Sequence, residues 1–87
     1  MDSFFGPSLD KNITEIDLHG IPDIHEALQI LEKELFQVGT RGQKYCRVIH
    51  GIGSGRLADA VEQALQENPM VYKWKRDEDG GSCIVLF

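Results

Sequence analysis

The chain contains little cysteine and no long apolar segment. Only two cysteines, Cys46 and Cys83, occur among the 87 residues, and they form no CxxC pair. A zinc site or a disulfide framework is therefore not indicated, and a reducing compartment is favoured. No apolar run approaches the roughly 20 residues that a membrane-spanning helix needs, and no signal-peptide pattern opens the chain. These absences predict a cytoplasmic protein.

Positive charge is also scarce. Nine lysines and arginines stand against 14 aspartates and glutamates, which gives a formal net charge of −5 at pH 7. Tight binding to nucleic acid through bulk electrostatics is disfavoured, because phosphate neutralisation requires clustered basic side chains. The distribution is uneven, however, and a local basic face stays open around the middle of the chain. The basic residues there are Arg41, Lys44, Arg47 and Arg56.

What the chain does have is a regular succession of strand and helix patterns. Alternating or continuous apolar residues indicate strands, and apolar residues every three or four positions indicate helices. Strands are predicted at 13–19, 45–49, 70–75 and 83–87, and helices between Asp23 and Gly39 and between Ser54 and Asn68. Ser54 is the expected N-cap of the second helix. The order β-α-β-α-β-β predicts an α/β fold, a small mixed four-stranded sheet with two helices.

The connections predict how the strands pair. A strand, a helix and a strand in succession favour a parallel pair joined by a right-handed crossover. The turn over 77–82 is short enough for an antiparallel hairpin. The last strand, 83–87, is apolar on both faces, which predicts a place in the interior of the sheet. Residues 1–12 are expected to form a short extension that lays Phe4 or Phe5 on the domain.

The most informative motif begins at Arg47 and reads Arg-Val-Ile-His-Gly-Ile-Gly-Ser-Gly-Arg-Leu. It predicts a buried strand that breaks into a glycine-rich turn and then opens a helix. Such a turn leaves backbone N–H groups unpaired at the positive end of the helix dipole, which suits a phosphate. Arg56 stands where a dinucleotide fingerprint needs its third glycine, and no P-loop lysine follows. A tight connection without a ligand is the alternative. The candidate phosphate-binding residues are Gly51, Gly53, Ser54, Gly55 and Arg56.

A second polar cluster ends the first predicted strand. Asp17 and His19 alternate with apolar residues, so they share one face and lie roughly 6–7 Å apart along the strand. Open α/β sheets bind ligands at the carboxyl ends of their strands. We therefore expect Asp17, His19 and His50 to meet there as a catalytic group. A histidine exchanges a proton near neutral pH, and Asp17 could orient it, act as a base or hold a divalent ion.

Other polar and aromatic positions carry weaker signals. His25 has no partner in view and is expected on the solvated surface. Tyr72 and Trp74 alternate with lysines, a pattern that suits base stacking but is more often a core pattern. The acidic run from Asp77 to Asp79 indicates a solvated turn.

Three motifs occur in a characteristic order. Asp17-Leu18-His19-Gly20 is followed roughly thirty residues later by His50-Gly51-Ile52-Gly53-Ser54-Gly55, and Gly80-Gly81 precedes the last apolar strand. Together they resemble the Smr (small MutS-related) domain family over about residues 13–87, with 1–12 as an N-terminal extension. The resemblance implies a two-layer α/β sandwich similar to the C-terminal domain of bacterial translation initiation factor three. That fold agrees with the element order above.

The resemblance also implies work on nucleic acid, since several family members nick DNA or cleave RNA. Asp17 and His19 match the family's catalytic acid-leucine-histidine motif. The residues from His50 to Gly55 match its glycine-rich motif, which is thought to contact the substrate backbone. Two departures are visible, because few basic residues flank the motifs and the segment from Gly80 to Cys83 is one glycine short. Both concern substrate affinity rather than the fold.

We therefore expect a hydrolase, an endonuclease with an Asp/His site, a phosphate cradle and His50 in an assisting role. RNA is slightly preferred over DNA, because a 2′-hydroxyl nucleophile lets such a site work without a metal. A divalent ion, Mg or Mn, stays open as a cofactor. The alternative is a non-catalytic module that binds nucleic acid, a ribosome or a larger protein, which the net charge favours. A small phosphorylated metabolite in the same cradle is a third hypothesis.

Overall fold

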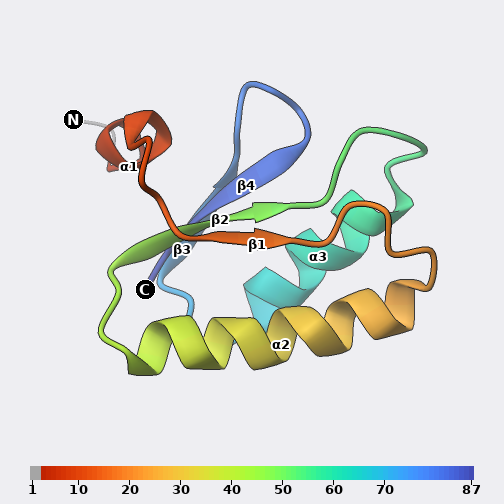
Figure 1. Cartoon of the computed structure of the whole chain (residues 1–87), viewed down its shortest axis with the longest axis horizontal. Coiled ribbons are helices and arrows are strands. Elements are labelled where there is room, and N and C mark those ends of the chain that lie inside the picture. The colour runs from red at the N-terminus through yellow and green to blue at the C-terminus, as the bar shows by residue number, and fades with distance from the viewer. Residues whose placement is uncertain (1–2) are drawn as a thin grey trace.

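The computed structural model describes residues 3–87, which form a four-stranded sheet, two long helices and one short helix (Figure 1). In chain order the elements are α1 (Phe5–Leu9), β1 (Glu15–Asp17), α2 (Ile24–Thr40), β2 (Tyr45–Ile49), α3 (Arg56–Glu67), β3 (Lys73–Arg76) and β4 (Ser82–Leu86). The predicted succession of strands and long helices is confirmed. Among the described residues, no helix is long and apolar enough to cross a membrane.

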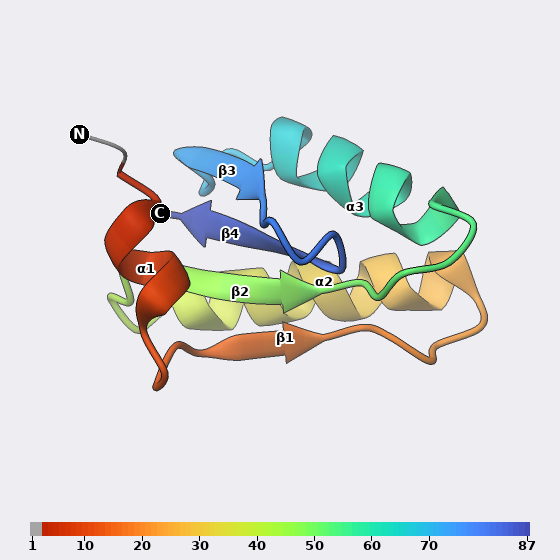
Figure 2. The same ribbon diagram turned by 90° about the horizontal axis from the view of Figure 1, so that it is seen from above.

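The sheet has the strand order β1-β2-β4-β3, which Figure 2 shows from above. β1 and β2 are parallel and are connected through α2, whereas β4 runs antiparallel to both of its neighbours, β2 and β3. The predicted mixed sheet and the closing hairpin are therefore confirmed. β4 lies in the interior of the sheet, as its continuous apolar sequence predicts, and all five of its residues are buried.

The two long helices cover the same face of the sheet (Figure 1). Asp23 caps α2 by accepting a hydrogen bond from the backbone N–H of His25 at 2.9 Å, which satisfies one free donor at the start of the helix. The apolar stripes of both helices then pack on the sheet. The buried core residues include Ile16, Leu31, Leu35, Val38, Val48, Val61, Leu65 and Val85. Each fully buried aliphatic side chain contributes about 1.5–3 kcal/mol, so this face accounts for most of the stability.

The opposite face, which we call the open face, carries the polar side chains of the strands. Every second residue of a strand points to the same side. In β1 only Ile16 is buried, while Glu15 and Asp17 are exposed. The register pairs Glu15 with Arg47 and Asp17 with Ile49, so these four residues share the open face. The positions between them point toward the helices.

The short helix α1 lies on the open-face side of the sheet, where it was predicted only as part of an extension (Figures 1 and 2). Its sequence contains Gly6 and Pro7, which are poor helix formers, so no helix signal is present. Contacts with β2 hold it instead. The Arg47 guanidinium donates to the Ser8 carbonyl at 3.2 Å, and the Tyr45 hydroxyl donates to Asp10 Oδ2 at 2.6 Å.

Candidate functional site

Asp17 and His19 form a hydrogen-bonded pair at the carboxyl end of β1. The backbone N–H of His19 donates to Asp17 Oδ1 at 3.1 Å, and the His19 imidazole Nδ1 bonds to the same oxygen. This imidazole contact is the main reason why the pKa of the Asp17 carboxyl is lowered from its ordinary value. Since an ionised carboxylate only accepts, Nδ1 carries the proton and Nε2 is left as a proton acceptor. The side chains are 65% and 49% exposed for His19 and Asp17, so both meet solvent.

The glycine-rich motif meets this pair at Gly51. Parallel pairing of Asp17 with Ile49 places Gly51 beside His19, two residues further along each strand. Gly51 has a φ of +82°, and a Cβ added there would lie 3.2 Å from His19 Cβ. The Gly81 carbonyl also fixes the end of β2, because it accepts the N–H groups of His50 and Gly51 at 3.0 and 2.9 Å. Glycine at position 51 is therefore required both by the backbone and by its neighbour.

A cavity of about 550 Å³ surrounds the Asp17–His19 pair on the open face. Arg47 is the cation that lines it, and its side chain is only 13% exposed. The guanidinium donates to Asp77 Oδ2 at 2.6 Å and to Ser82 Oγ at 2.8 Å, so it is already paired within the chain. This bond lowers the pKa of the Asp77 carboxyl. The acidic turn is thus an ion-pair partner of β2, whereas the sequence indicates only a solvated turn.

His50 does not join the pair. It follows Ile49 by one residue, so it points away from the open face, and it is 4% exposed. Its Nδ1–H donates to the Gly51 carbonyl at 2.9 Å, and its Nε2 has no partner among the described residues. It lines a separate cavity of about 150 Å³ with the loop from Gly51 to Gly55. Asp17 and His19 therefore lie together as expected, but His50 does not join them. Side chains alternate along a strand, so His50 points toward the helices.

The loop between β2 and α3 leaves the start of the helix without a side-chain cap. The N-cap is Gly55, which has a φ of +85°, and not Ser54 as predicted. Ser54 Oγ instead accepts the N–H of Arg56 at 3.4 Å, a long contact within the turn. The positive φ at Gly55 moves the helix start one residue later than the serine signal indicates. The first N–H groups of α3 lie at the positive end of its dipole, which is the arrangement that favours an anion.

Arg56 and Ser54 face a different cavity from the Asp17–His19 pair. This cavity has a volume of about 430 Å³ and lies between the starts of α2 and α3, with Pro22 and Asp23 on its other side. Of the predicted phosphate-binding residues, Gly51 adjoins the pair, and Gly53 and Gly55 line the loop cavity with His50. The candidate cradle therefore borders the pair at one end only.

Sequence reasoning missed four polar residues of the cavity around the pair. They are Glu15, Arg47, Asp79 and Ser82, which line it together with Asp17 and His19. A signal for the first two exists in strand alternation, because Glu15 shares the face of Asp17 in β1, and Arg47 shares the face of Ile49 rather than that of buried Val48 in β2. The other two depend on the register between β2 and β4, which no local pattern specifies.

The chain offers few donors for a metal or a redox group. Within residues 3–87, no three His, Cys, Asp or Glu side chains gather into a group that could hold a metal ion. Asp17 and His19 supply two such donors, so solvent or substrate would complete any coordination there. Cys46 and Cys83 are buried, and burial raises the pKa of each thiol to about 12. Both therefore remain uncharged thiols at neutral pH.

Comparison with known proteins identifies the family. The family model described as the Smr domain matches residues 16–87. Endonuclease MutS2 of Aquifex aeolicus is 40% identical over 83 residues, which cover 92% of this chain and 10% of that protein. Endonuclease MutS2 of Thermomicrobium roseum is 36% identical over 74 residues, covering 83% of this chain and 9% of that protein. The chain thus spans about a tenth of the length of the curated relatives it matches.

A solved structure agrees with this assignment. The crystal structure of the Smr domain of Thermus thermophilus MutS2 superposes with a TM-score of 0.79 at 28% sequence identity. The match covers 85% of this chain and 96% of that one, so the two share the whole domain rather than a fragment. The helix α1 precedes the residues that the family model matches. The chain belongs to the Smr domain family.

Proposed function

We propose that this domain cleaves phosphodiester bonds in nucleic acid, with Asp17 and His19 in the catalytic roles. The observation that carries the proposal is their hydrogen-bonded pair, which is open to solvent in a cavity on the open face. A carboxylate that holds one imidazole nitrogen as a donor leaves the other free to accept a proton. Membership of the Smr family and similarity to proteins named endonucleases support the same chemistry.

The geometry suits general base catalysis by His19. In RNA, Nε2 would take the proton of the 2′-hydroxyl, whose oxygen then bonds to the neighbouring phosphorus while the bond to the 5′-oxygen breaks. The departing 5′-oxygen takes up a proton from the imidazolium or from water. Asp17 stays ionised throughout and stabilises the charged imidazole. RNA is the proposed substrate, since its 2′-hydroxyl supplies a nucleophile that a single base activates.

The glycine-rich loop would hold the phosphate beside this pair. Gly51 lies against His19, and a loop without side chains there lets the sugar–phosphate backbone approach closely. The amide groups before Arg56 add the dipole of α3, which stabilises charge on the phosphate. Because Arg47 is paired with Asp77, few cations contribute. We expect weak binding with a slope of log affinity against log salt of about −1 to −2.

The second candidate function is a nucleic-acid-binding module without catalysis. It is favoured by one specific observation, the neutralisation of Arg47 by Asp77 in the cavity around the pair. A domain of net charge −5 with its local cation engaged would stabilise a phosphodiester transition state poorly. In this case a larger partner would supply positive surface.

Cleavage assays with matched histidine variants test the proposal. A labelled single-stranded RNA and a supercoiled plasmid are incubated with wild type, Asp17→Asn, His19→Ala and His25→Ala, with and without chelator. His25 is an exposed control in the first turn of α2, where its backbone N–H bonds to Asp23. We expect His19→Ala to cleave RNA about 10²- to 10⁴-fold more slowly, the usual contribution of a general base. His25→Ala should match wild type.

Two results would overturn the catalytic assignment. Cleavage that persists at the wild-type rate in both Asp17→Asn and His19→Ala would show that another site or a contaminant is responsible. Binding of RNA by wild type without any cleavage would favour the binding module instead. The chelator arm shows whether a divalent ion takes part.

A further inference from the structure

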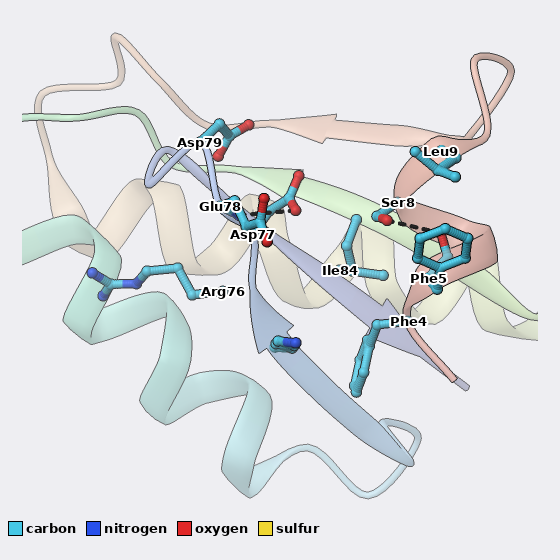
Figure 3. A pocket seen from close by; sticks show the side chains of 10 residues that line it. Phe4, Phe5, Ser8, Leu9, Arg76, Asp77, Glu78, Asp79 and Ile84 are labelled. Carbon is cyan, nitrogen blue, oxygen red and sulfur yellow. Dashed lines mark hydrogen bonds between the residues drawn. The ribbon is translucent and has the colours of Figure 1, made fainter. Parts of the chain in front are cut away.

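A cleft lies between α1 and the turn of the β3–β4 hairpin, next to the candidate catalytic cavity (Figure 3). Its volume is about 310 Å³, at the lower end of the range found for small-molecule sites. Phe4, Phe5 and Leu9 line the α1 side, and Ile84 of β4 forms the floor. Figure 3 shows the acidic residues of the hairpin turn across Ile84 from the two phenylalanines. The cleft thus has one apolar wall and one acidic wall. Lys75 and Arg76 of β3 also line it, and the Arg76 guanidinium donates to Glu62 at 2.6 Å.

Arg47 connects the two walls through hydrogen bonds, so the cleft is a defined part of the folded domain. One end of the guanidinium donates to the Ser8 carbonyl of α1 at 3.2 Å, and the other donates to Asp77 of the hairpin at 2.6 Å. Ser8 Oγ donates in turn to the Phe5 carbonyl at 2.8 Å. The α1 wall of the cleft precedes the residues matched by the Smr family model, whereas the hairpin wall lies within them.

The chemistry of the two walls selects a neutral, flat ligand with hydrogen-bond donors. Phe5 is 64% exposed, so the face of its ring is open to stacking. On the acidic side, Asp77 is engaged by Arg47, and Asp79 accepts bonds from Gly81 and Ser82. The carboxylate of Glu78, which is exposed, makes no hydrogen bond among the described residues. It can accept N–H groups from a ligand, and it repels a phosphate.

A guanine base fits this description better than the other nucleobases. Its N1–H and exocyclic amine lie on one edge and both donate to a single carboxylate, whereas adenine and cytosine offer only the amine there. Uracil places carbonyl oxygens on both sides of its N–H, and these would face the carboxylate. An aromatic side chain stacks on any base, so the stacking wall adds affinity and Glu78 adds the preference.

The position of the cleft connects it to the proposed reaction. Asp79 lines both the cleft and the cavity around Asp17 and His19, and both open on the same face of the sheet. Building on the nucleic-acid cleavage proposed above, we propose that the cleft binds a guanine base of a single-stranded substrate, adjacent to the cleaved phosphodiester. The base stacks on Phe5 and donates its N1–H and amine to Glu78.

NMR titration of the full ¹⁵N-labelled chain tests the site without relying on cleavage. The probes are 2′-O-methyl-uridine octamers that carry one central guanine, adenine or cytosine, or none, because a methylated 2′-oxygen cannot act as the nucleophile. The guanine octamer should bind about fivefold more tightly than the uridine octamer, as expected from the hydrogen bonds to Glu78 that uridine cannot donate, and shift the amide signals of Phe5, Glu78 and Ile84. His25→Ala, at an exposed histidine in the first turn of α2, should bind all four probes as wild type does.

Two substitutions and one control separate stacking from hydrogen bonding. Phe5→Leu should weaken binding of the guanine octamer by removing the stacking partner, whereas Phe36→Leu, at an equally exposed phenylalanine of α2, should bind it as wild type does. Glu78→Gln should retain stacking but reduce the ratio of guanine to adenine affinity toward one. Guanine preference that persists in a wild-type domain unable to cleave RNA would sustain the site and refute the catalytic function.

Three outcomes would overturn the base site. Equal affinity for the four octamers would remove the preference. An equal loss of guanine binding in Phe36→Leu and Phe5→Leu would place the contact elsewhere. A short arginine-rich peptide that shifts the same amides at lower concentration than the guanine octamer would identify the cleft as a protein-binding site.

Discussion

The chain carries the dipeptide His-Gly at the ends of two adjacent parallel strands, and the two histidines have opposite environments. His19 is mostly exposed and paired with Asp17, whereas His50 is 4% exposed and bonded to a carbonyl of its own turn. Both following glycines have a φ of +82°. The difference follows from the alternation of side chains along a strand. Asp17 pairs with Ile49 in the sheet, and both lie on the open face. His19 lies two residues after this pair and stays on the open face, whereas His50 lies one residue after it and points toward the helices. A one-residue offset therefore separates an exposed, carboxylate-paired histidine from a buried one.

The largest effect that distinguishes the two histidines is on stability. His50→Ala should lower the free energy of unfolding by about 2 kcal/mol, because it leaves a cavity and breaks a buried hydrogen bond. His19→Ala should change it by less than about 0.5 kcal/mol, as expected for an exposed side chain. Urea denaturation of both variants measures the difference. Equal losses of stability would mean that the face of the strand on which each histidine lies does not distinguish the two residues.

The two glycines allow a sharper test of the contact between the motifs. Gly20 and Gly51 share the same φ, but nothing lies within 4 Å of a Cβ at Gly20, whereas one at Gly51 meets His19. Gly20→Ala should therefore cost about 1 kcal/mol from backbone strain alone. Gly51→Ala should cost more and should also slow cleavage by displacing His19. Denaturation and RNA cleavage assays check this, and identical behaviour of the two variants would contradict the packing of Gly51 on the Asp17–His19 pair.

The smallest effect is a change in the titration of Asp17. Its carboxyl pKa is lowered chiefly by the hydrogen bond from His19, so this bond stabilises the fold above the unfolded pKa of about 3.9. The contribution is lost as pH falls through the folded pKa. In His19→Ala the pKa of Asp17 should rise toward its ordinary value, and in His50→Ala it should stay lowered. Carbon-detected NMR titration of the carboxyl group follows both. A rise in His50→Ala would place the two histidines in one site.

Much of the fold could be predicted because its signals are local. The helix stripes, the interior place of β4 and the pairing of Asp17 with His19 all follow from periodicities of 3.6 and 2. The burial of His50 could also be predicted, because it lies on the same face of the strand as buried Cys46 and Val48. The expectation that all polar residues at a strand end lie together did not take this alternation into account.

Other features depend on long-range pairing that no local pattern encodes. α1 contains a glycine and a proline and forms where Arg47 and Tyr45 bind its end, about 35 to 40 residues away in the chain. The partnership of Arg47 with Asp77 requires the register between β2 and β4. The shift of the N-cap from Ser54 to Gly55 arises from a positive φ rather than from side-chain chemistry. Likeness to the C-terminal domain of translation initiation factor three stays a prediction.

The carbonyl of Gly81 accepts hydrogen bonds from the amides of both His50 and Gly51. One peptide group therefore holds the glycine-rich loop and the hairpin turn together. A fluctuation that lifts the hairpin turn away from β2 releases both amides together. The glycine loop loses its support in the same event that moves the acidic wall of the cleft. We therefore expect correlated motions in the candidate catalytic cavity and the cleft, and a ligand that holds the turn in place should also reduce the motion of the residues beside His19.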